Sequence, residues 1–182
     1  MRSPQPTVLI LASGRGARFE ASGGQGAKLQ APLLGKPVLQ HTLDTVRATG
    51  LPYHLETAPH PGMGDSIAAA VAATRDADGW LVLPGDLPLI QSSTLLAVAD
   101  ALALHAVVVP VFSGQRGHPV GFAAACRDAL LVLGGAHGAA AVVRAQGSHE
   151  VVLDDVGIVT DVDTVQDLER AAQLLNLRNG RP

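Results

Sequence analysis

The sequence is poor in aromatic residues, cysteine and lysine. Aromatic residues make up only 3% of its 182 residues, so a core must be built from leucine, valine, isoleucine and alanine. The single cysteine, Cys126, excludes a disulfide framework and is better explained as a small core residue than as a nucleophile. The sequence has no signal-peptide pattern and no apolar run near the roughly 20 residues of a membrane span. We therefore expect a cytoplasmic protein with no membrane partner.

Long runs of one charge are also missing. The formal net charge is -3 and no extended basic segment occurs, which argues against a nucleic-acid partner. Apolar residues make up 47% of the chain and charged residues 16%, a balance that excludes a disordered protein. The length suits one well-filled core and is too short for two ordinary domains. We expect one domain over residues 1–182, with residues 177–182 as a frayed tail.

Strand-like and helix-like segments alternate along the chain. This order predicts an α/β fold, and we expect a single Rossmann-like three-layer domain with a mainly parallel sheet. Strands are predicted at Thr7–Ala12, Tyr53–Thr57, Trp80–Leu83, Ala106–Phe112, Val120–Ala123, Glu150–Leu153 and Ile158–Thr160. Helices are predicted at Pro37–Thr49, Asp65–Arg75, Ser92–Leu104, Ala124–Leu133, Ala139–Gln146 and Asp163–Leu175.

The most informative segment follows the first predicted strand, Thr7–Ala12. It is a glycine-rich loop that carries Arg15, Arg18 and Lys28. Glycines let backbone N–H groups approach an anion, while arginine and lysine supply positive charge. Both lysines of the chain, Lys28 and Lys36, lie in this region, although its other basic residues are all arginine. The pattern favours phosphate binding over the alternative of a solvated surface loop.

Two well-known phosphate loops do not fit this segment. The dinucleotide-binding pattern G-x-G-x-x-G needs a glycine where the chain has Phe19. The P-loop pattern needs glycine before its lysine and a hydroxyl residue after it, but Lys28 lies between Ala27 and Leu29. The loop therefore predicts a small polyphosphate ligand that is held in another way.

Two acidic motifs are candidates for holding a metal ion. Asp86 follows a buried strand, at the sheet edge where open α/β folds bind ligands, and one carboxylate plus substrate phosphates is a usual Mg²⁺ site. The segment Pro84–Pro88 is equally typical of a plain turn. Asp161 and Asp163 precede the last helix, where an N-cap at Asp163 or Thr164 is favoured over a second metal ligand.

A further loop, Arg116–Phe122, places a histidine between glycine and proline. It is either a simple turn or a loop that lines a substrate site. The chain has no His/Cys spacing typical of zinc and no G-x-S-x-G nucleophile motif, so a protein-only transition-metal site is not expected.

Taken together, these motifs resemble the MobA-like nucleotidyltransferases, and within them the MocA-like molybdenum cofactor cytidylyltransferases. The family opens with a strand and L-A-[AG]-G-x-[SG]-x-R-[MF], then a lysine, then G-x-P-L. Its later motifs are G-M-x-x-S-[LI], G-D-x-P, G-x-P-[VI] and D-x-D-T-P-E-D, and their order is more specific than any one of them. The matching segments here are Leu11–Phe19, Lys28–Leu29, Gly35–Leu39, Gly62–Ile67, Gly85–Pro88, Gly117–Val120 and Asp161–Asp167.

The resemblance implies an α/β fold of the nucleotide-diphospho-sugar transferase type. It also implies that CMP is transferred from CTP to a phosphate acceptor, molybdopterin or molybdenum cofactor, with release of pyrophosphate. The implied catalytic residues are Arg18, Lys28 and Asp86, and Mg²⁺ would be held by Asp86 with Asp161 or Asp163. The implied nucleotide-binding residues are Leu11, Ala12, Ser13, Gly14, Arg15, Gly16, Lys28, Ser66, Pro84 and Gly85, and the implied acceptor-binding residues are Gly117, His118 and Pro119.

Three features depart from the family pattern. Ser13 stands where the family tends to have alanine for cytosine and glycine for guanine. The segment between Phe19 and Lys28 is longer than usual. A late family motif, G-D-x-G-A-R, corresponds to Gly135–Ala140, which lacks both the acid and the arginine. GTP as the nucleotide, and a sugar or alcohol phosphate as the acceptor, therefore stay open.

Two other classes of protein remain as alternatives. The altered Gly135–Ala140 segment would suit an accessory protein that binds a nucleotide without catalysis. The partial Gly14–Gly16 pattern would suit a nicotinamide-dependent oxidoreductase, although Phe19 argues against it. For the enzyme, a molybdoenzyme or its chaperone would be the expected protein partner.

Overall fold

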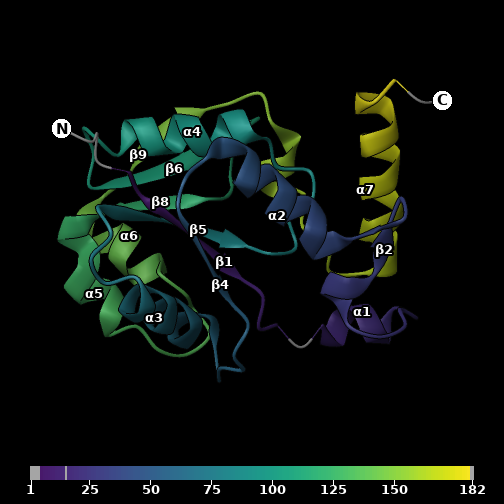
Figure 1. The fold of residues 1–182 in the computed structure, drawn as a ribbon, viewed down its shortest axis with the longest axis horizontal. Helices are drawn as coiled ribbons and strands as arrows, with labels where there is room; N and C mark the ends of the chain where they lie inside the picture. The colour runs from purple at the N-terminus through teal and green to yellow at the C-terminus, as the bar shows by residue number, and fades with distance from the viewer. Residues whose placement is uncertain (1–4, 15, 181–182) are drawn as a thin grey trace.

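The computed structural model describes residues 5–14 and 16–180 and centres on one seven-stranded sheet (Figure 1). Its strands are β1 Thr7–Leu11, β4 Tyr53–Glu56, β5 Gly79–Pro84, β6 Val107–Phe112, β7 Gln115–Arg116, β8 Val120–Ala123 and β9 His149–Val152. Successive strands pair in the order β4, β1, β5, β8, β6, β7. Strand β9 lies off this path and also pairs with β6.

The strand directions confirm a mainly parallel sheet. β1 pairs in parallel with β4 and β5, and β6 pairs in parallel with β9. β8 runs antiparallel between β5 and β6, so β4, β1, β5, β6 and β9 all point the same way. The carboxyl ends of β1, β4 and β5 therefore meet at one edge, which is where open α/β sheets bind ligands.

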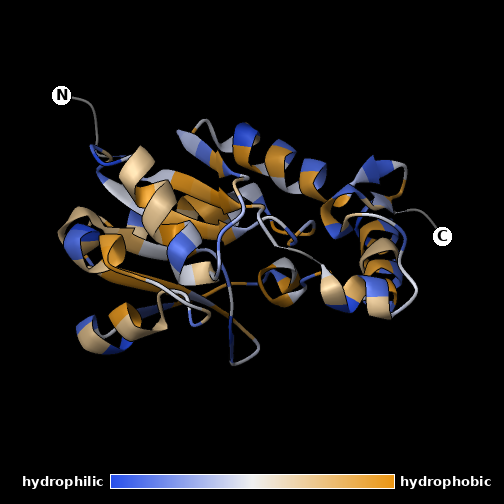
Figure 2. Ribbon diagram, turned by 90° about the horizontal axis from the view of Figure 1, so that it is seen from below, coloured by the Kyte–Doolittle hydropathy of each residue, from blue (hydrophilic) through white to orange (hydrophobic). Residues whose placement is uncertain are grey.

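Helices cover both faces of the sheet and confirm the expected three layers (Figure 1). One face carries α2 (Val38–Thr49) and α4 (Ser92–Ala101), and the other carries α3 (Met63–Ala73), α5 (Arg127–Leu131) and α6 (Ala140–Gln146). Figure 2 shows strands that are mostly hydrophobic and helices that carry a hydrophilic side away from them.

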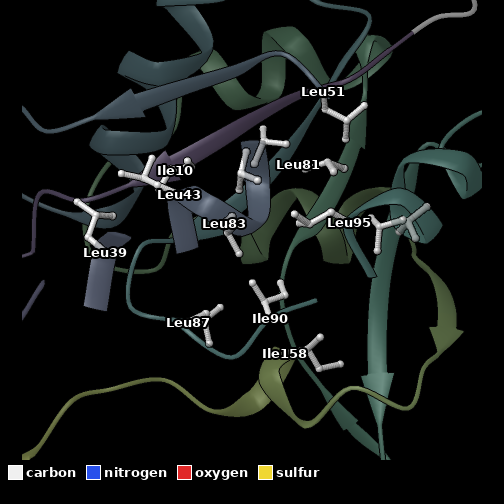
Figure 3. Close-up of a cluster of buried hydrophobic side chains, with 14 residues drawn as sticks. Ile10, Leu39, Leu43, Leu51, Leu81, Leu83, Leu87, Ile90, Leu95 and Ile158 are labelled. Atoms are coloured by element: carbon white, nitrogen blue, oxygen red, sulfur yellow. The ribbon is translucent and has the colours of Figure 1, made fainter. Parts of the chain in front are cut away.

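Strand β1 shows how the two faces arise from the sequence. Side chains alternate between the faces of a strand, so Val8 and Ile10 pack toward α2 and α4, while Leu9 packs toward α3 and α5. All three side chains are fully buried, and burying each stabilises the fold by about 1.5–3 kcal/mol. In Figure 3, Ile10 lies beside Leu43 of α2 in the first of these clusters.

A smaller core lies beside the sheet. It joins α1 (Ala17–Ala21), the 3-10 turn η1 (Lys28–Gln30), the hairpin of β2 (Pro32–Leu33) with β3 (Lys36–Pro37), and α7 (Val165–Arg178). Figure 1 shows α7 standing next to β2 and α1, away from the sheet. Phe19 is 2% exposed in this core, so it anchors the loop that carries Arg18.

Most of the predicted helices and strands are confirmed to within a few residues. Helix α2, for example, ends at Gly50, whose φ of 71° is the left-handed conformation that glycine adopts easily. None of the helices in the described ranges is both long enough and apolar enough to cross a membrane.

Two expectations need correction, and two further features were missed. Residues 158–160 do not form a strand. Residues Val156–Val159 form the 3-10 turn η3, whose N-cap Asp155 accepts a hydrogen bond from the Gly157 amide through its side chain. Residues 177 and 178 belong to α7 rather than to a frayed tail, and Arg178 Nη1 donates a hydrogen bond to the Leu89 carbonyl at 2.7 Å. Helix α1 and the β2–β3 hairpin were not predicted, because glycine-rich sequence carries no clear periodicity.

The carboxylate of Asp155 ties η3 to α4. Its Oδ2 accepts hydrogen bonds from the Gln91 amide at 3.0 Å and the Thr94 hydroxyl at 2.6 Å, and its Oδ1 accepts one from the Gly157 amide at 2.9 Å. Because Asp155 is 3% exposed, these bonds replace its contacts with water. Ile158, within η3, then joins the main core (Figure 3). This anchoring fixes the chain just before it reaches Asp161.

We expect the Asp155→Ala variant to lose about 2–4 kcal/mol of unfolding free energy, because three buried donors would be left without their acceptor. Urea unfolding followed by circular dichroism measures the difference. Asp154→Ala is the matched control, since Asp154 is an exposed neighbour and its loss should change stability by less than about 0.5 kcal/mol. Equal losses in the two variants would contradict the anchoring role.

Candidate active site

A cleft of about 650 Å³ opens at the carboxyl ends of β1, β4 and β5. Its walls come from the loops that follow these strands, from the β7–β8 turn, and from the segment between η3 and α7. The structure thus brings together most of the residues singled out in the sequence. Those that line the cleft are Leu11, Ser13, Gly14, Arg18, Lys28, Ser66, Pro84, Asp86, Gly117, His118, Asp161 and Asp163.

Other predicted residues lie behind the cleft wall. Gly16 has a φ of 65°, and a Cβ there would lie 3.1 Å from Cβ of Lys28, so glycine lets η1 pack close. The Gly85 amide donates to the Leu11 carbonyl at 2.9 Å and thereby joins the ends of β1 and β5. Ala12 and Pro119 are likewise absent from the lining. Arg15 lies outside the described residues.

Lys28 connects two carboxylates across the cleft. Its Nζ donates hydrogen bonds to Oδ2 of Asp86 and to Oδ1 of Asp163, each at 2.7 Å. Arg18 Nη2 lies 2.7 Å from the other oxygen of Asp163. The Lys28 side chain is only 11% exposed, whereas that of Arg18 is 78% exposed. The lysine is therefore the fixed cation of the cleft, and the arginine reaches it from the solvent side.

These ion pairs change the acid–base properties of both partners. Burial alone would lower the pKa of Lys28, but the carboxylates of Asp86 and Asp163 outweigh burial and raise that pKa. Burial alone would raise the pKa of Asp163, but Lys28 and then Arg18 outweigh it and lower that pKa. Both groups are therefore held in their charged forms at neutral pH.

Asp161 completes a cluster of three carboxylates with Asp86 and Asp163. One oxygen from each lies within 4.8 Å of the others. Burial raises the pKa of Asp161, and the charges of Asp163 and Asp86 raise it further. Oδ1 of Asp86 is buried and has no hydrogen-bond partner among the described residues. Oxygen ligands of this kind fit Mg²⁺ or Mn²⁺, so the donor set matches a divalent metal.

The backbone before α7 holds these carboxylates in place. The Val162 amide donates to the Asp86 carbonyl at 3.0 Å, which joins the two acidic segments directly. Thr164 is the N-cap of α7 and forms a capping box with Asp167. Because Thr164 takes the capping position, the Asp163 side chain remains free to face Lys28.

A further part of the cleft lining is a pair of hydroxyl groups. Oγ of Ser13 and Oγ of Ser66 lie 2.8 Å apart, which connects the loop after β1 to the first turn of α3. The serine that departs from the family pattern is thus accommodated by a second serine within hydrogen-bond distance.

The remaining wall is built around Gly117 and His118. The Gly117 amide donates to the Pro110 carbonyl at 2.9 Å, and a Cβ at Gly117 would lie 2.3 Å from the Ile158 carbonyl oxygen. The His118 amide donates to that same carbonyl at 3.0 Å. Burial lowers the pKa of the His118 ring, and the opposing influence of Asp86 is weaker. The ring therefore faces the cleft in its neutral form.

Several residues of the cleft carried no signal in the sequence. His60 and Pro61 line it from the loop after β4, and His60 Nε2 lies 3.2 Å from Oε1 of the buried Glu56. Gln115 and Val159 reach it from β7 and η3. None of them belongs to a recognisable local pattern. Their place in the cleft follows from chain topology alone.

The fold and the cleft together define an α/β protein of the nucleotidyltransferase class. A family model for the MobA-like NTP transferase domain matches residues 45–151, more than half of the chain, and the chain belongs to this family. The matched range contains Asp86 and His118, whereas Lys28, Asp161 and Asp163 lie outside it.

Solved structures share this fold over nearly their whole length. Rv0371c from Mycobacterium tuberculosis H37Rv has a TM-score of 0.80 at 24% identity, covering 95% of this chain and 100% of that chain. The same protein in complex with manganese has a TM-score of 0.73 at 22% identity, with 93% and 98% covered. Molybdopterin-guanine dinucleotide biosynthesis protein A from Archaeoglobus fulgidus has a TM-score of 0.68 at 16% identity, with 94% and 99% covered.

The chain also resembles part of some longer curated proteins. The bifunctional protein GlmU of Halorhodospira halophila is 32% identical over 152 residues, which is 70% of this chain. The chain spans only about 30% of the length of that relative. The similarity therefore covers one part of a larger protein.

We expect the Lys28→Met variant to be less stable at neutral pH by about 1–3 kcal/mol, because hydrogen bonds to charged groups are lost and carboxylates stay uncompensated. Lys36→Met is the matched control. Lys36 pairs with Asp44 at 2.7 Å, but both side chains are more than 40% exposed, so the loss should stay below about 1 kcal/mol.

The stability difference for Lys28→Met should depend on pH in a defined way. The pKa of Asp163 is lowered in the fold, so its contribution is present above the ordinary aspartate pKa and is lost as the pH falls through the lowered value. The pKa of Lys28 is raised, so its contribution is lost only as the pH rises through the raised value. Urea unfolding with a chelator present checks this, and a difference independent of pH would contradict the ion pairing.

Proposed function

We propose that this protein transfers CMP from CTP to a phosphorylated acceptor of the molybdopterin type and releases pyrophosphate, with Mg²⁺ as its metal ion. The observation that carries the proposal is the bridge of Lys28 to Asp86 and Asp163 inside the cleft. It places a buried cation beside carboxylates that suit a divalent metal, which are the two kinds of group that phosphate transfer requires.

Phosphate binding is assigned to the loop after β1. Gly14 lines the cleft just after this strand, and Arg18 and Lys28 line the same cleft. Arg18 is largely exposed, so it can leave Asp163 and turn toward the β- and γ-phosphates, while Lys28 is more buried, where the α-phosphate would lie. Arg15 and the backbone at Gly16 belong to the same proposed loop. A phosphate oxygen of the acceptor is itself the nucleophile, so the reaction mainly needs positioning and charge stabilisation.

Metal binding is assigned to Asp86 together with Asp161 or Asp163. When bound, Mg²⁺ would neutralise charge on the phosphates and help to align them. The manganese complex of Rv0371c supports a divalent ion in a protein of this fold. Asp163 also orients Lys28, whereas Asp161 has a raised pKa and no cationic partner within the described ranges. Both remain candidates for the second ligand.

The nucleotide base is placed against Leu11–Ser13 and Ser66, with Pro84 and Gly85 beneath it. Within the family, alanine at the position of Ser13 goes with cytosine and glycine goes with guanine. Serine has the Cβ that alanine has and glycine lacks, and its hydroxyl is already paired with Ser66. This steric similarity favours CTP over GTP.

The acceptor is placed on the wall formed by Gly117 and His118, with Pro119 next to them in the chain but outside the lining. His118 feels the charge of Asp86, and both line the same cleft as Lys28, so an acceptor phosphate bound here would lie near the proposed α-phosphate position. The Archaeoglobus fulgidus protein of this fold is a molybdopterin-guanine dinucleotide biosynthesis protein, which supports a pterin acceptor. A molybdoenzyme or its chaperone would then receive the product.

The direct test is to incubate the purified protein with Mg²⁺, molybdopterin and either CTP or GTP, and to measure pyrophosphate release. We expect release with CTP and little with GTP. Release with GTP alone would make the protein a guanylyltransferase. Triphosphate binding without release, also with sugar or alcohol phosphates as acceptors, would contradict nucleotidyl transfer and favour an accessory role.

We expect the Asp86→Asn variant to lose activity by about a hundredfold or more, because it removes a charged metal ligand at the reacting phosphate. Pyrophosphate release at saturating Mg²⁺ and CTP is the measurement. Asp44→Asn, an exposed carboxylate that pairs with Lys36 outside the cleft, is the control and should remain active. Full turnover by Asp86→Asn would show that the metal assignment is wrong.

A further inference from the structure

Two glycine-rich segments, residues 62–66 and 134–138, interlock behind one wall of the cleft. The Gly64 amide donates a hydrogen bond to the Gly135 carbonyl at 2.8 Å. In return, the Gly135 amide donates to Oδ2 of Asp65 at 2.9 Å, across 70 residues of sequence. The two segments therefore exchange a pair of hydrogen bonds, one of which is made to a charged carboxylate.

The packing between these segments leaves no space for side chains. A Cβ on Gly62 would lie 2.3 Å from the Gly135 oxygen, and a Cβ on Gly64 would lie 2.8 Å from Gly134. On the other side, a Cβ on Gly138 would lie 3.0 Å from the sulfur of Met63. The contact is thus made largely between backbones, and a small shift of one segment must move the other.

Only one of the two segments faces the cleft. Gly62, Met63 and Ser66 line it, whereas no residue of 134–138 contributes to the lining within the described part of the chain. The 134–138 segment can therefore act on a ligand only through residues 62–66. This also changes the interpretation of the altered Gly135–Ala140 motif. The position of the missing acid, Ala136, falls in this supporting segment, and that of the missing arginine, Ala140, begins α6.

The hydrogen bonds also complete the start of α3. The first amides of a helix have no partners within the helix, and the N-cap residue Gly62 has no side chain to offer one. The Gly135 carbonyl takes this role for Gly64, and Asp65 in the first turn accepts in return. The arrangement works as a capping box whose two halves come from distant parts of the chain.

We infer that Asp65 is a positioning residue for the nucleotide. By holding residues 134–138 against residues 62–66, it fixes the first turn of α3 and with it Ser66, which faces Ser13. The inference rests on the proposed function, because it takes the Ser13–Ser66 wall to be the side that binds the nucleotide. Its consequence is that Asp65 sets nucleotide affinity without touching the nucleotide or the reacting atoms.

The test compares Asp65→Ala with the unaltered protein. We expect the Kd for CTP, measured by titration calorimetry with Mg²⁺ and no acceptor, to rise about tenfold. This is the effect expected from the loss of one hydrogen bond to a charged group. The kcat and the acceptor KM should stay close to those of the unaltered protein. Asp65→Asn keeps an acceptor oxygen and should recover most of the affinity. Asp76→Ala, an exposed acid just beyond α3, is the control for charge.

A second readout reports on the contact itself. Hydrogen exchange at the Gly135 amide should become faster in Asp65→Ala and stay slow in Asp76→Ala, because only the first removes its acceptor. Gly64→Ala should weaken CTP binding as Asp65→Ala does, by forcing the segments apart. Gly134→Ala should not, because its Cβ would lie at an ordinary 3.5 Å from Oδ1 of Asp65.

The outcomes separate this inference from the proposed function. An unchanged Kd in Asp65→Ala, together with faster exchange at Gly135, would overturn the positioning role. A loss of kcat with an unchanged Kd would also overturn it. If Asp65→Ala does not fold, Asp65→Ser, which suits a first helical turn but is too short to reach Gly135, gives the same comparison. Failure of the unaltered protein to bind any nucleoside triphosphate would instead overturn the proposed function.

Discussion

A single ammonium group joins three parts of the chain that are far apart in sequence. Lys28 begins η1, Asp86 follows the end of β5 and Asp163 belongs to the segment before α7. The lysine ammonium lies 2.7 Å from an oxygen of each carboxylate. Charges so little exposed need partners, because isolated ions are costly away from water. Three other interactions hold the segments that carry these charged groups in place. Asp155 fixes η3, the Val162 amide binds the Asp86 carbonyl, and the cap of α7 leaves Asp163 free.

The layered fold could be predicted where local signals were strong. Strand β1 is a continuous apolar run, and α2 has an amphipathic pattern that stops at a glycine, so both were located well. The strand predicted at residues 158–160 was wrong, because a short run of β-branched residues is compatible with both a strand and a buried 3-10 turn. The difference is made by Asp155, whose partners in α4 are about 60 residues away and leave no local trace.

The residues of the candidate site also differ in how far local sequence signals could reveal them. Arg18, Lys28 and Asp86 could be singled out because glycine, charge and strand ends coincide in the sequence. Spacing alone favoured a helix cap at Asp163 or Thr164 over a metal ligand, and only the structure places the cap at Thr164, which leaves the Asp163 side chain available to the cleft. His60 reaches the cleft because β4 pairs with β1, and no local sequence motif predicts this pairing. Long-range pairing, rather than composition, decided what the sequence could not reveal.

The unusually long segment between Phe19 and Lys28 is held at both of its ends. Phe19 is buried in the side core and Lys28 is fixed by its carboxylates, while Gly23, Gln25 and Gly26 between them are exposed. The middle of this segment is therefore directed into solvent, away from the cleft. The same property makes Gln25 a natural attachment point for a fluorophore, because it is exposed, lies between Arg18 and Lys28 in the sequence, and takes no part in the cleft lining.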